Sequence, residues 1–221
     1  MTAKHLRLLW EETGNPSPSA RGRAVVGLMV TLVILTVDHY RQFFAVPVLD
    51  DVLLYLVIPL LVIVVVYRRS PLGYGLGPGR WREGLAWSAG GVLLMVGVAW
   101  LYANRPASNA YYQDYTLLRN PGGQFWAGVG LSGIQMFAWE FLIRGFLLFS
   151  LADLFGPDAV WIHTVPYVMA HFGKPEWETY SSIPGGLLAG WITYRVGSIF
   201  PAWLIHWALA VGISWFLGGG F

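Results

Sequence analysis

Cysteine is absent from the 221 residues of this chain, and only 12% of them are charged. The absence of cysteine excludes disulfide scaffolds, cysteine-based zinc fingers, iron–sulfur clusters and thiol nucleophiles. Soluble domains carry about 25% charged residues, so the chain has roughly half the charge that a wetted surface needs. A net charge of +2 gives no basis for a nucleic-acid partner. Because 56% of the residues are hydrophobic, the sequence indicates a protein of the lipid bilayer.

The charged residues fall in clusters that leave long uncharged runs between them. Two of these runs have 21 and 26 residues, from Gly84 to Asn104 and from Val196 to Phe221. A spanning helix needs about 20 mostly apolar residues, and shorter runs reach that length by taking in polar flanks that snorkel. We therefore predict an all-α polytopic membrane bundle of seven spans, or eight if the fourth is broken. The predicted spans lie near residues 22–39, 50–67, 84–103, 124–152, 158–173, 181–196 and 199–218.

The lysine and arginine residues predict the orientation of the chain in the membrane. With the N-terminus cytoplasmic, the inside segments hold nine of these residues and the outside segments four. We therefore expect residues 1–221 to form one multi-pass domain of a bacterial or archaeal cytoplasmic membrane. Residues 1–21 would be a cytoplasmic segment, and the C-terminus would lie outside.

Ionisable side chains at membrane depth are costly, so their default interpretation is functional. Glu140 and Arg144 lie four residues apart in the fourth span, so they share a helical face and can form an ion pair. His171 lies at the end of the fifth span, with Tyr167 one turn before it, and His206 lies inside the seventh. Each of these groups also has a structural interpretation: a buried ion pair, an interfacial histidine, or a hydrogen bond between helices.

Three helices that converge could place Glu140, His171 and His206 around one pocket. Such a set permits two mechanisms. Glu140 could act as the general base that activates a water, with the histidines stabilising the oxyanion. The three side chains could instead hold a divalent metal, with zinc the candidate, although the chain has no HExxH spacing. His163 is more often structural, but it could support His171 from two turns away.

A Gly/Ser motif and the high tryptophan content suggest two other interpretations. Residues 130–133, Gly-Leu-Ser-Gly, match the GxSG around the nucleophile of rhomboid serine proteases, which would make Ser132 and His206 a dyad. Such a short motif arises easily among 27 glycines, which also serve helix contacts. The 12 tryptophans are better explained by interfacial belts than by a ligand cage.

Three motifs, in order along the chain, resemble those of the CPBP intramembrane proteases, which include the prenyl-protein C-a-a-X endopeptidases and bacterial Abi proteins. WEFLIRGFLLF at 139–149 resembles the family's EExxxRG signature, and YVMAH at 167–171 resembles its FxxxH motif. YRVGSIFPAWLIHWALA at 194–210 resembles its closing segment. The resemblance covers about residues 80–218, the predicted protease core. It implies peptide hydrolysis within the membrane by a glutamate-activated water, without a required cofactor.

Carried over residue by residue, the resemblance implies that Glu140 is the base, Arg144 its partner, and His171 and His206 oxyanion or water-positioning groups. It leaves Tyr167, Trp139, His163 and Glu176 as substrate-binding or supporting candidates. The substrate would be a membrane-anchored protein or peptide.

Two positions depart from the family pattern. The first glutamate of the family's pair is Trp139 here, and the asparagine usual four residues after the last histidine is Ala210. One residue turns a helix by about 100°, so Glu140 can serve only if the helix is turned or bent. A chain that has lost activity would remain as a maturation, immunity or scaffold protein. A transporter subunit would be expected to show repeats, and none is evident.

Overall fold

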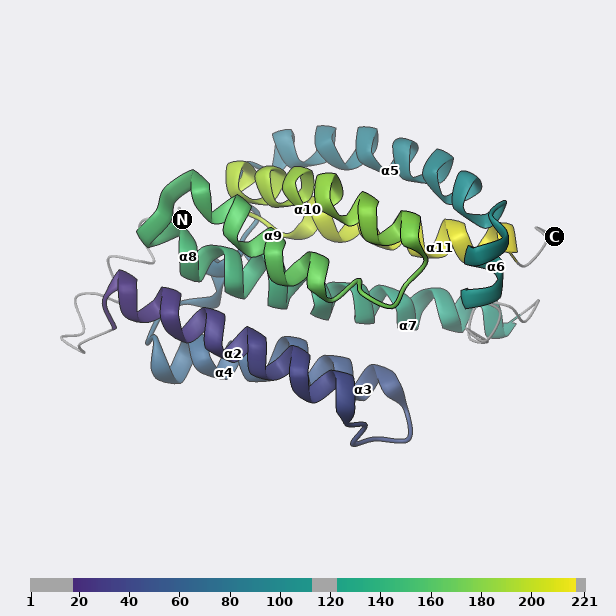
Figure 1. Ribbon diagram of the computed structural model, residues 1–221. Coiled ribbons are helices and arrows are strands. Elements are labelled where there is room, and N and C mark those ends of the chain that lie inside the picture. Colours follow the sequence, from purple (N-terminus) through teal and green to yellow (C-terminus); the bar gives the residue numbers. More distant parts are fainter. Residues whose placement is uncertain (1–17, 113–122, 218–221) are drawn as a thin grey trace.

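A computed structural model describes residues 18–112 and 123–217 as a bundle of helices that run side by side (Figure 1). The described part of the chain contains no strand, as the composition predicts for an all-α membrane protein. The elements are α2 (Ala20–Tyr40), α3 (Pro47–Asp51), η1 (Val52–Val57), α4 (Ile58–Leu61), η2 (Val62–Val66), η3 (Pro71–Tyr74), α5 (Trp81–Ala103), α6 (Pro106–Tyr112), α7 (Gly123–Glu140), η5 (Phe141–Leu147), α8 (Leu148–Phe155), η6 (Gly156–Asp158), α9 (Ala159–Met169), α10 (Glu176–Val196) and α11 (Phe200–Leu217).

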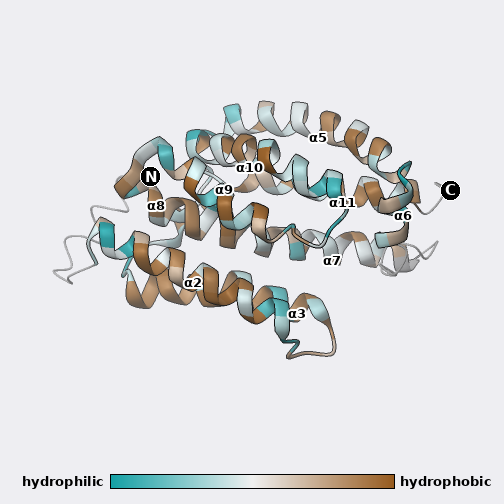
Figure 2. Cartoon of the chain, in the orientation of Figure 1, coloured by the Kyte–Doolittle hydropathy of each residue, from teal (hydrophilic) through white to brown (hydrophobic). Residues whose placement is uncertain are grey.

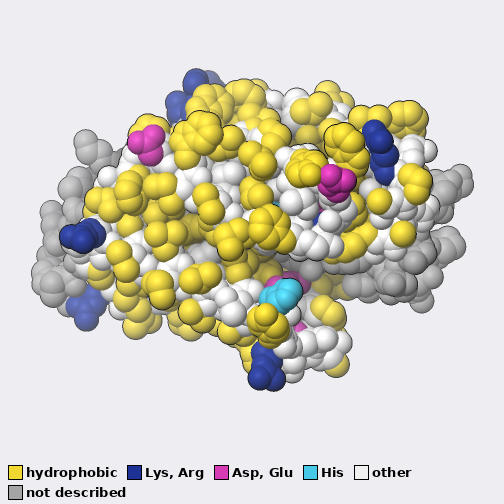
Figure 3. Space-filling model, in the orientation of Figure 1, with side chains coloured by type: hydrophobic (Ala, Val, Ile, Leu, Met, Phe, Trp, Pro, Cys, Tyr) yellow, Lys and Arg dark blue, Asp and Glu magenta, His cyan; other side chains and the backbone are white. Residues whose placement is uncertain are grey.

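Within the described residues, five helical segments are long and apolar enough to cross a membrane. One of the five covers both α7–α8 and α9, from Phe125 to Met169. Hydrophobic residues colour most of the bundle in Figure 2, and hydrophobic side chains cover much of the face seen in Figure 3. The chain is therefore a multi-pass integral membrane protein.

The run α7–η5–α8 forms the interior of the bundle. Between Phe141 and Leu148 every residue is buried, and their neighbours come from α2, η1, α4 and α9. The apolar side chains of this run join a core that includes Ile34, Ile63 and Tyr67. The predicted fourth span is thus one continuous helical run, with a π-helical segment, η5, in its middle.

Polar contacts join the helices at both ends of the bundle. At the end where α2 begins (Figure 1), Arg23 donates to Asp153 of α8 at 2.5 Å, and the hydroxyl of Tyr67 donates to the carbonyl of Arg23 at 2.8 Å. At the opposite end, Glu178 accepts from Lys174 at 2.8 Å and from the hydroxyl of Tyr112 at 2.5 Å. Charges at the ends and apolar side chains between them match the pattern predicted from the sequence.

Helix boundaries mostly agree with the predicted spans, with one difference that concerns the site. The fifth helix, α9, ends at Met169, so His171 lies in the turn that follows and not in the helix. Gly173 has a φ of 90°, a conformation that glycine adopts without strain, and it carries the turn towards α10. The predicted cytoplasmic segment 1–21 lies outside the described residues as far as residue 17.

Candidate active site

Glu140, Arg144 and His206 meet inside the bundle, where α11 packs against α7. Arg144 donates from Nη1 to Oε1 of Glu140, as the four-residue spacing predicts. Nδ1 of His206 lies 2.7 Å from the same oxygen. The Glu140 side chain is fully buried and that of Arg144 is 1% exposed, whereas that of His206 is 20% exposed. The ion pair is therefore shielded from the surroundings, and the imidazole is the part of the cluster that can be reached from outside.

The helix changes its geometry directly after Glu140. Residues Phe141–Leu147 form the π-helical segment η5, and Arg144 lies within it. A π-helix bonds each residue to the fifth one along, so it holds more residues per turn than an α-helix and rotates whatever follows. Because η5 begins after Glu140, it turns Arg144 and the residues that follow, and it leaves the direction of Glu140 on α7 unchanged. Segments of this kind occur frequently at functional sites.

Aromatic rings extend the cluster to His171. The guanidinium of Arg144 lies over the ring of Tyr167, 4.4 Å from its centroid, and the centroid of the His171 ring lies 4.6 Å from that of Tyr167. Nδ1 of His171 is 2.7 Å from the carbonyl oxygen of Tyr167. Trp139 packs between Tyr167 and Tyr55, at centroid distances of 6.2 and 5.3 Å. Among the described residues no hydrogen bond joins His171 to Glu140 or His206. Tyr167, which contacts both Arg144 and His171, therefore links His171 to the cluster of Glu140, Arg144 and His206.

The other two supporting candidates, His163 and Glu176, form their hydrogen bonds outside this cluster. His163 is fully buried, and its Nδ1 lies 2.7 Å from the carbonyl oxygen of Val160. Its ring packs against Gly190, where a Cβ would meet His163 Cε1 at 2.1 Å, so His163 joins α9 to α10. Glu176 is exposed at the start of α10 and accepts from the hydroxyl of Tyr180 at 2.8 Å. Neither hydrogen-bonds to the Glu140 cluster.

The geometry separates the competing chemistries. Within the described residues no group of three or more His, Cys, Asp or Glu side chains is arranged to hold a metal ion, so Glu140, His171 and His206 do not form a ligand set. The hydroxyl of Ser132 donates to the carbonyl of Val129 at 2.9 Å and lies 3.2 Å from Nε1 of Trp207. It has no hydrogen bond to His206, as a serine–histidine dyad would require.

Two contacts to the second span were not anticipated from the sequence. Tyr55 packs on Trp139, and Gln135 donates to Asp51 at 2.8 Å. Both partners on α7 lie within the five residues before Glu140, so η1 and the end of α3 brace this part of the helix. The available signal was weak: Asp51 and Tyr55 are spaced by one helical turn, as are Gln135 and Trp139.

The two oxygens of Glu140 differ in their hydrogen-bond partners, and this difference indicates what the cluster can do. Oε1 of Glu140 is occupied by Arg144 and His206, whereas Oε2 is buried and has no hydrogen-bond partner among the described residues. A buried carboxylate oxygen needs a donor, and a water molecule is the usual one. The arrangement suits activation of a water by an oriented carboxylate, with a partly exposed imidazole beside it.

The long apolar helices define the class of the chain, a polytopic membrane protein. The buried Glu–Arg pair, with a histidine from another helix, forms its candidate hydrolytic site. Residues 121–212 match the family model described as type II CAAX prenyl endopeptidase Rce1-like. This part of the chain is therefore a domain of the Rce1-like, or CPBP, family, and it contains Glu140, Arg144, His171 and His206. No curated protein and no solved structure matched the chain.

Proposed function

We propose that this chain is an intramembrane endopeptidase that hydrolyses a peptide bond of a membrane-associated protein or peptide. The observation that carries the proposal is the fully buried Glu140, held on one oxygen by Arg144 and His206 while the other oxygen is left without a partner. Buried charge is costly, and the domain belongs to a family described as CAAX prenyl endopeptidase-like, which together support a catalytic use.

In the proposed reaction, Oε2 of Glu140 takes a proton from water as the water oxygen forms a bond with the substrate carbonyl carbon. Arg144 holds the carboxylate in place through the ion pair. We propose that His206 acts as an imidazolium, whose Nδ1 hydrogen is donated to Oε1 of Glu140 and whose Nε2 hydrogen is donated to the developing oxyanion, while His171 helps to position the water. The carbon–nitrogen bond then breaks, and the proton held by Glu140 passes to the leaving amine. Atoms and charge balance without a metal, and we propose that no cofactor is required.

We also propose a seven-span topology with the N-terminus cytoplasmic and the C-terminus outside. In this arrangement α7–α8, α9 and α10 are separate passes, and α9 reaches the outer surface through its following turn. The start of α2 and the end of α11 lie at opposite ends of the bundle (Figure 1), as an odd number of passes requires. The site would then lie within the bilayer and meet a substrate that is itself embedded in or anchored to the membrane.

The test is the cleavage rate of Glu140→Gln in proteoliposomes, measured with a quenched-fluorescence library of membrane-embedded peptides. General-base catalysis contributes about 10²–10⁴ in rate, so we expect a loss of at least about a hundredfold. Asp158→Asn removes an exposed carboxylate on η6 and serves as the matched control, with an unchanged rate. An undiminished rate in a folded Glu140→Gln protein would overturn the proposal, and an inert wild type would favour a scaffold or immunity role.

The same assay examines the serine alternative. We expect Ser132→Ala to cleave normally, because the Ser132 hydroxyl is engaged by Val129 and Trp207 and not by His206. A loss of cleavage in Ser132→Ala, with Glu140→Gln still active, would replace the glutamate mechanism by a rhomboid-like one.

A further inference from the structure

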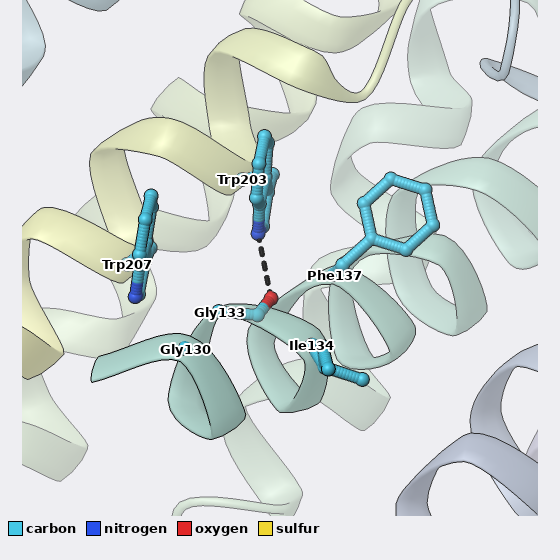
Figure 4. A pocket seen from close by; sticks show the side chains of 6 residues that line it. All are labelled: Gly130, Gly133, Ile134, Phe137, Trp203 and Trp207. Carbon is cyan, nitrogen blue, oxygen red and sulfur yellow. Dashed lines mark hydrogen bonds between the residues drawn. The ribbon is translucent and has the colours of Figure 1, made fainter. Parts of the chain in front are cut away.

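An open hollow of about 250 Å³ lies between α7 and α11, the two helices that carry Glu140 and His206. Its walls are Gly130, Gly133, Ile134, Phe137, Trp203 and Trp207 (Figure 4). Each wall belongs to a helix that also supplies the site: Phe137 lies three residues before Glu140, and Trp203 three residues before His206. The hollow therefore continues the same seam in which the carboxylate and the imidazole meet.

The surface of the hollow is almost entirely apolar. Trp203 donates its Nε1 hydrogen to the carbonyl of Gly133 at 2.9 Å, and Trp207 donates to the carbonyl of Val129 at 3.1 Å (Figure 4 shows the first). The two indole rings are stacked, at a centroid distance of 5.5 Å and an angle of 4°. Because their N–H groups are already engaged, the rings offer faces but no hydrogen bond to an occupant.

Two glycines make the space. A Cβ at Gly133 would meet Trp207 Cε2 at 3.1 Å, so this glycine lets the indole approach the helix. A Cβ at Gly130 would meet no atom within 4 Å, so the absence of a side chain there leaves room that nothing in the described chain fills. Specific ligand pockets begin at about 300 Å³ for drug-sized molecules, so this hollow suits one or two side chains.

The position of the hollow along the seam relates it to the scissile bond. With about 1.5 Å of helix rise per residue, the walls from Phe137 to Gly130 lie about 5 to 15 Å from Glu140 along α7. An extended peptide advances about 3.3 Å per residue. A peptide that runs along the seam therefore brings its second to fourth residue from the cleaved bond into the hollow.

We propose that this hollow, the α7–α11 groove, is a substrate subsite that selects an apolar side chain two to four residues from the cleaved bond. The proposal rests on the proposed peptidase function and adds the determinant of its specificity. Gly130, which has no side chain, leaves the space for the substrate side chain, and the indole faces of Trp203 and Trp207 limit its size. A lipid acyl chain is the competing occupant, and the experiment separates the two.

The first measurement is the specificity of Gly130→Leu, with kcat and KM determined for membrane peptides that carry Ala, Leu or Phe at each position near the cleavage site. A few methylene groups in an apolar pocket change discrimination about 10–200-fold. At one of the second to fourth positions from the cleaved bond, we expect the KM of peptides with Leu or Phe to rise at least about tenfold. Peptides with Ala at the same position should keep their kcat. Gly90→Leu on α5 is the matched control, because a Cβ there also meets no atom within 4 Å, and it should change neither constant. A uniform effect on all peptides, or none, would overturn the subsite.

The second measurement reads binding without cleavage. The chain has no cysteine, so Gly130→Cys provides a single thiol for a benzophenone photocrosslinker. In a Glu140→Gln background, the probe is a biotinylated Leu/Ala peptide of about 20 residues in phosphatidylcholine vesicles, long enough to span the bilayer. We expect crosslinks to the peptide at its second to fourth residue from the bond that wild type cleaves, and none from Gly90→Cys.

Crosslinks to lipid alone, or to peptide positions spread along its length, would overturn the subsite even if wild type cleaves. If wild type cleaves nothing, the peptidase proposal fails, and the crosslinks still decide whether the groove holds a peptide or lipid.

Discussion

Helix α5 and the run α7–η5–α8 are both apolar, yet they differ in what surrounds them. In α5, 17% of the most apolar stretch is buried, whereas for the segment that contains α7–η5–α8 and α9 the share is 67%. After Glu83 the chain carries no charged residue to the end of α5, but the inner run holds Glu140 and Arg144 at its centre. Apolar composition suffices to place a helix in the bilayer. A charge at that depth also needs protein around it to pair and shield it.

The largest loss of stability is expected when Arg144 is replaced. Arg144→Met leaves Glu140 buried without its cation, and removal of one partner of a buried pair costs about 3–5 kcal/mol. Restoring charge balance in the double variant Glu140→Gln/Arg144→Met should recover most of that free energy of unfolding. Both are measured by thermal unfolding in detergent. Leu93→Met, at an exposed site on α5, should stay within about 0.5 kcal/mol of wild type. A loss below about 1 kcal/mol for Arg144→Met would mean that the pair is well solvated.

A second comparison uses the same substitution in both helices. In η5, a Cβ at Gly145 would meet Phe141 Cδ2 at 2.6 Å and the carbonyl oxygen of Tyr74 at 2.9 Å. Gly145→Ala should therefore cost about 1–3 kcal/mol through overpacking. On α5, Gly90→Ala meets nothing within 4 Å and should raise stability by up to about 1 kcal/mol, the difference in helix propensity. Equal effects in chemical unfolding would show that the two helices are packed alike.

A smaller loss of stability is expected at Tyr167, the residue that contacts both Arg144 and His171. Tyr167→Leu removes the ring below Arg144, and a cation–π contact is worth about 0.5–2 kcal/mol. Tyr167→Phe keeps the ring and should restore both stability and kcat. If Phe behaves like Leu in unfolding and cleavage assays, the hydroxyl and not the ring is what matters.

The smallest effect is expected from chelation. EDTA, followed by readdition of Zn²⁺, should leave both Tm and the cleavage rate unchanged within error, because Glu140, His171 and His206 do not form a ligand set. Loss of activity that Zn²⁺ restores would replace the metal-free mechanism with a metal-assisted one.

Much of the architecture could be predicted from charge spacing alone, since uncharged runs of spanning length leave few alternatives. The Glu140–Arg144 pair could be predicted as well, because a spacing of four residues fixes their relative direction on a helix. The inferred topology also predicts that His206 and His171 lie near Glu140, and the structure brings His206 to Glu140 whereas His171 contacts Tyr167.

Other features depend on contacts between distant segments. The π-helical turn at Phe141–Leu147 has no local sequence signal such as proline, so its position could not be read from the chain. The contact of His171 with Tyr167 in place of Glu140 follows from α9 ending at Met169, two residues before His171. Trp203 and Trp207, which composition assigns to interfacial belts, line the α7–α11 groove, and Gly133 on α7 gives the Trp207 ring room to approach.

In the proposed mechanism, the carboxylate of Glu140 is kept at the centre of the bundle for catalysis and not for stability. Its most direct test is the cleavage rate of Glu140→Gln/Arg144→Met, the variant expected to fold as well as wild type. We expect a stable, monodisperse protein whose cleavage rate is at least about a hundredfold below that of wild type. An equally stable double variant that cleaves at the wild-type rate would contradict it.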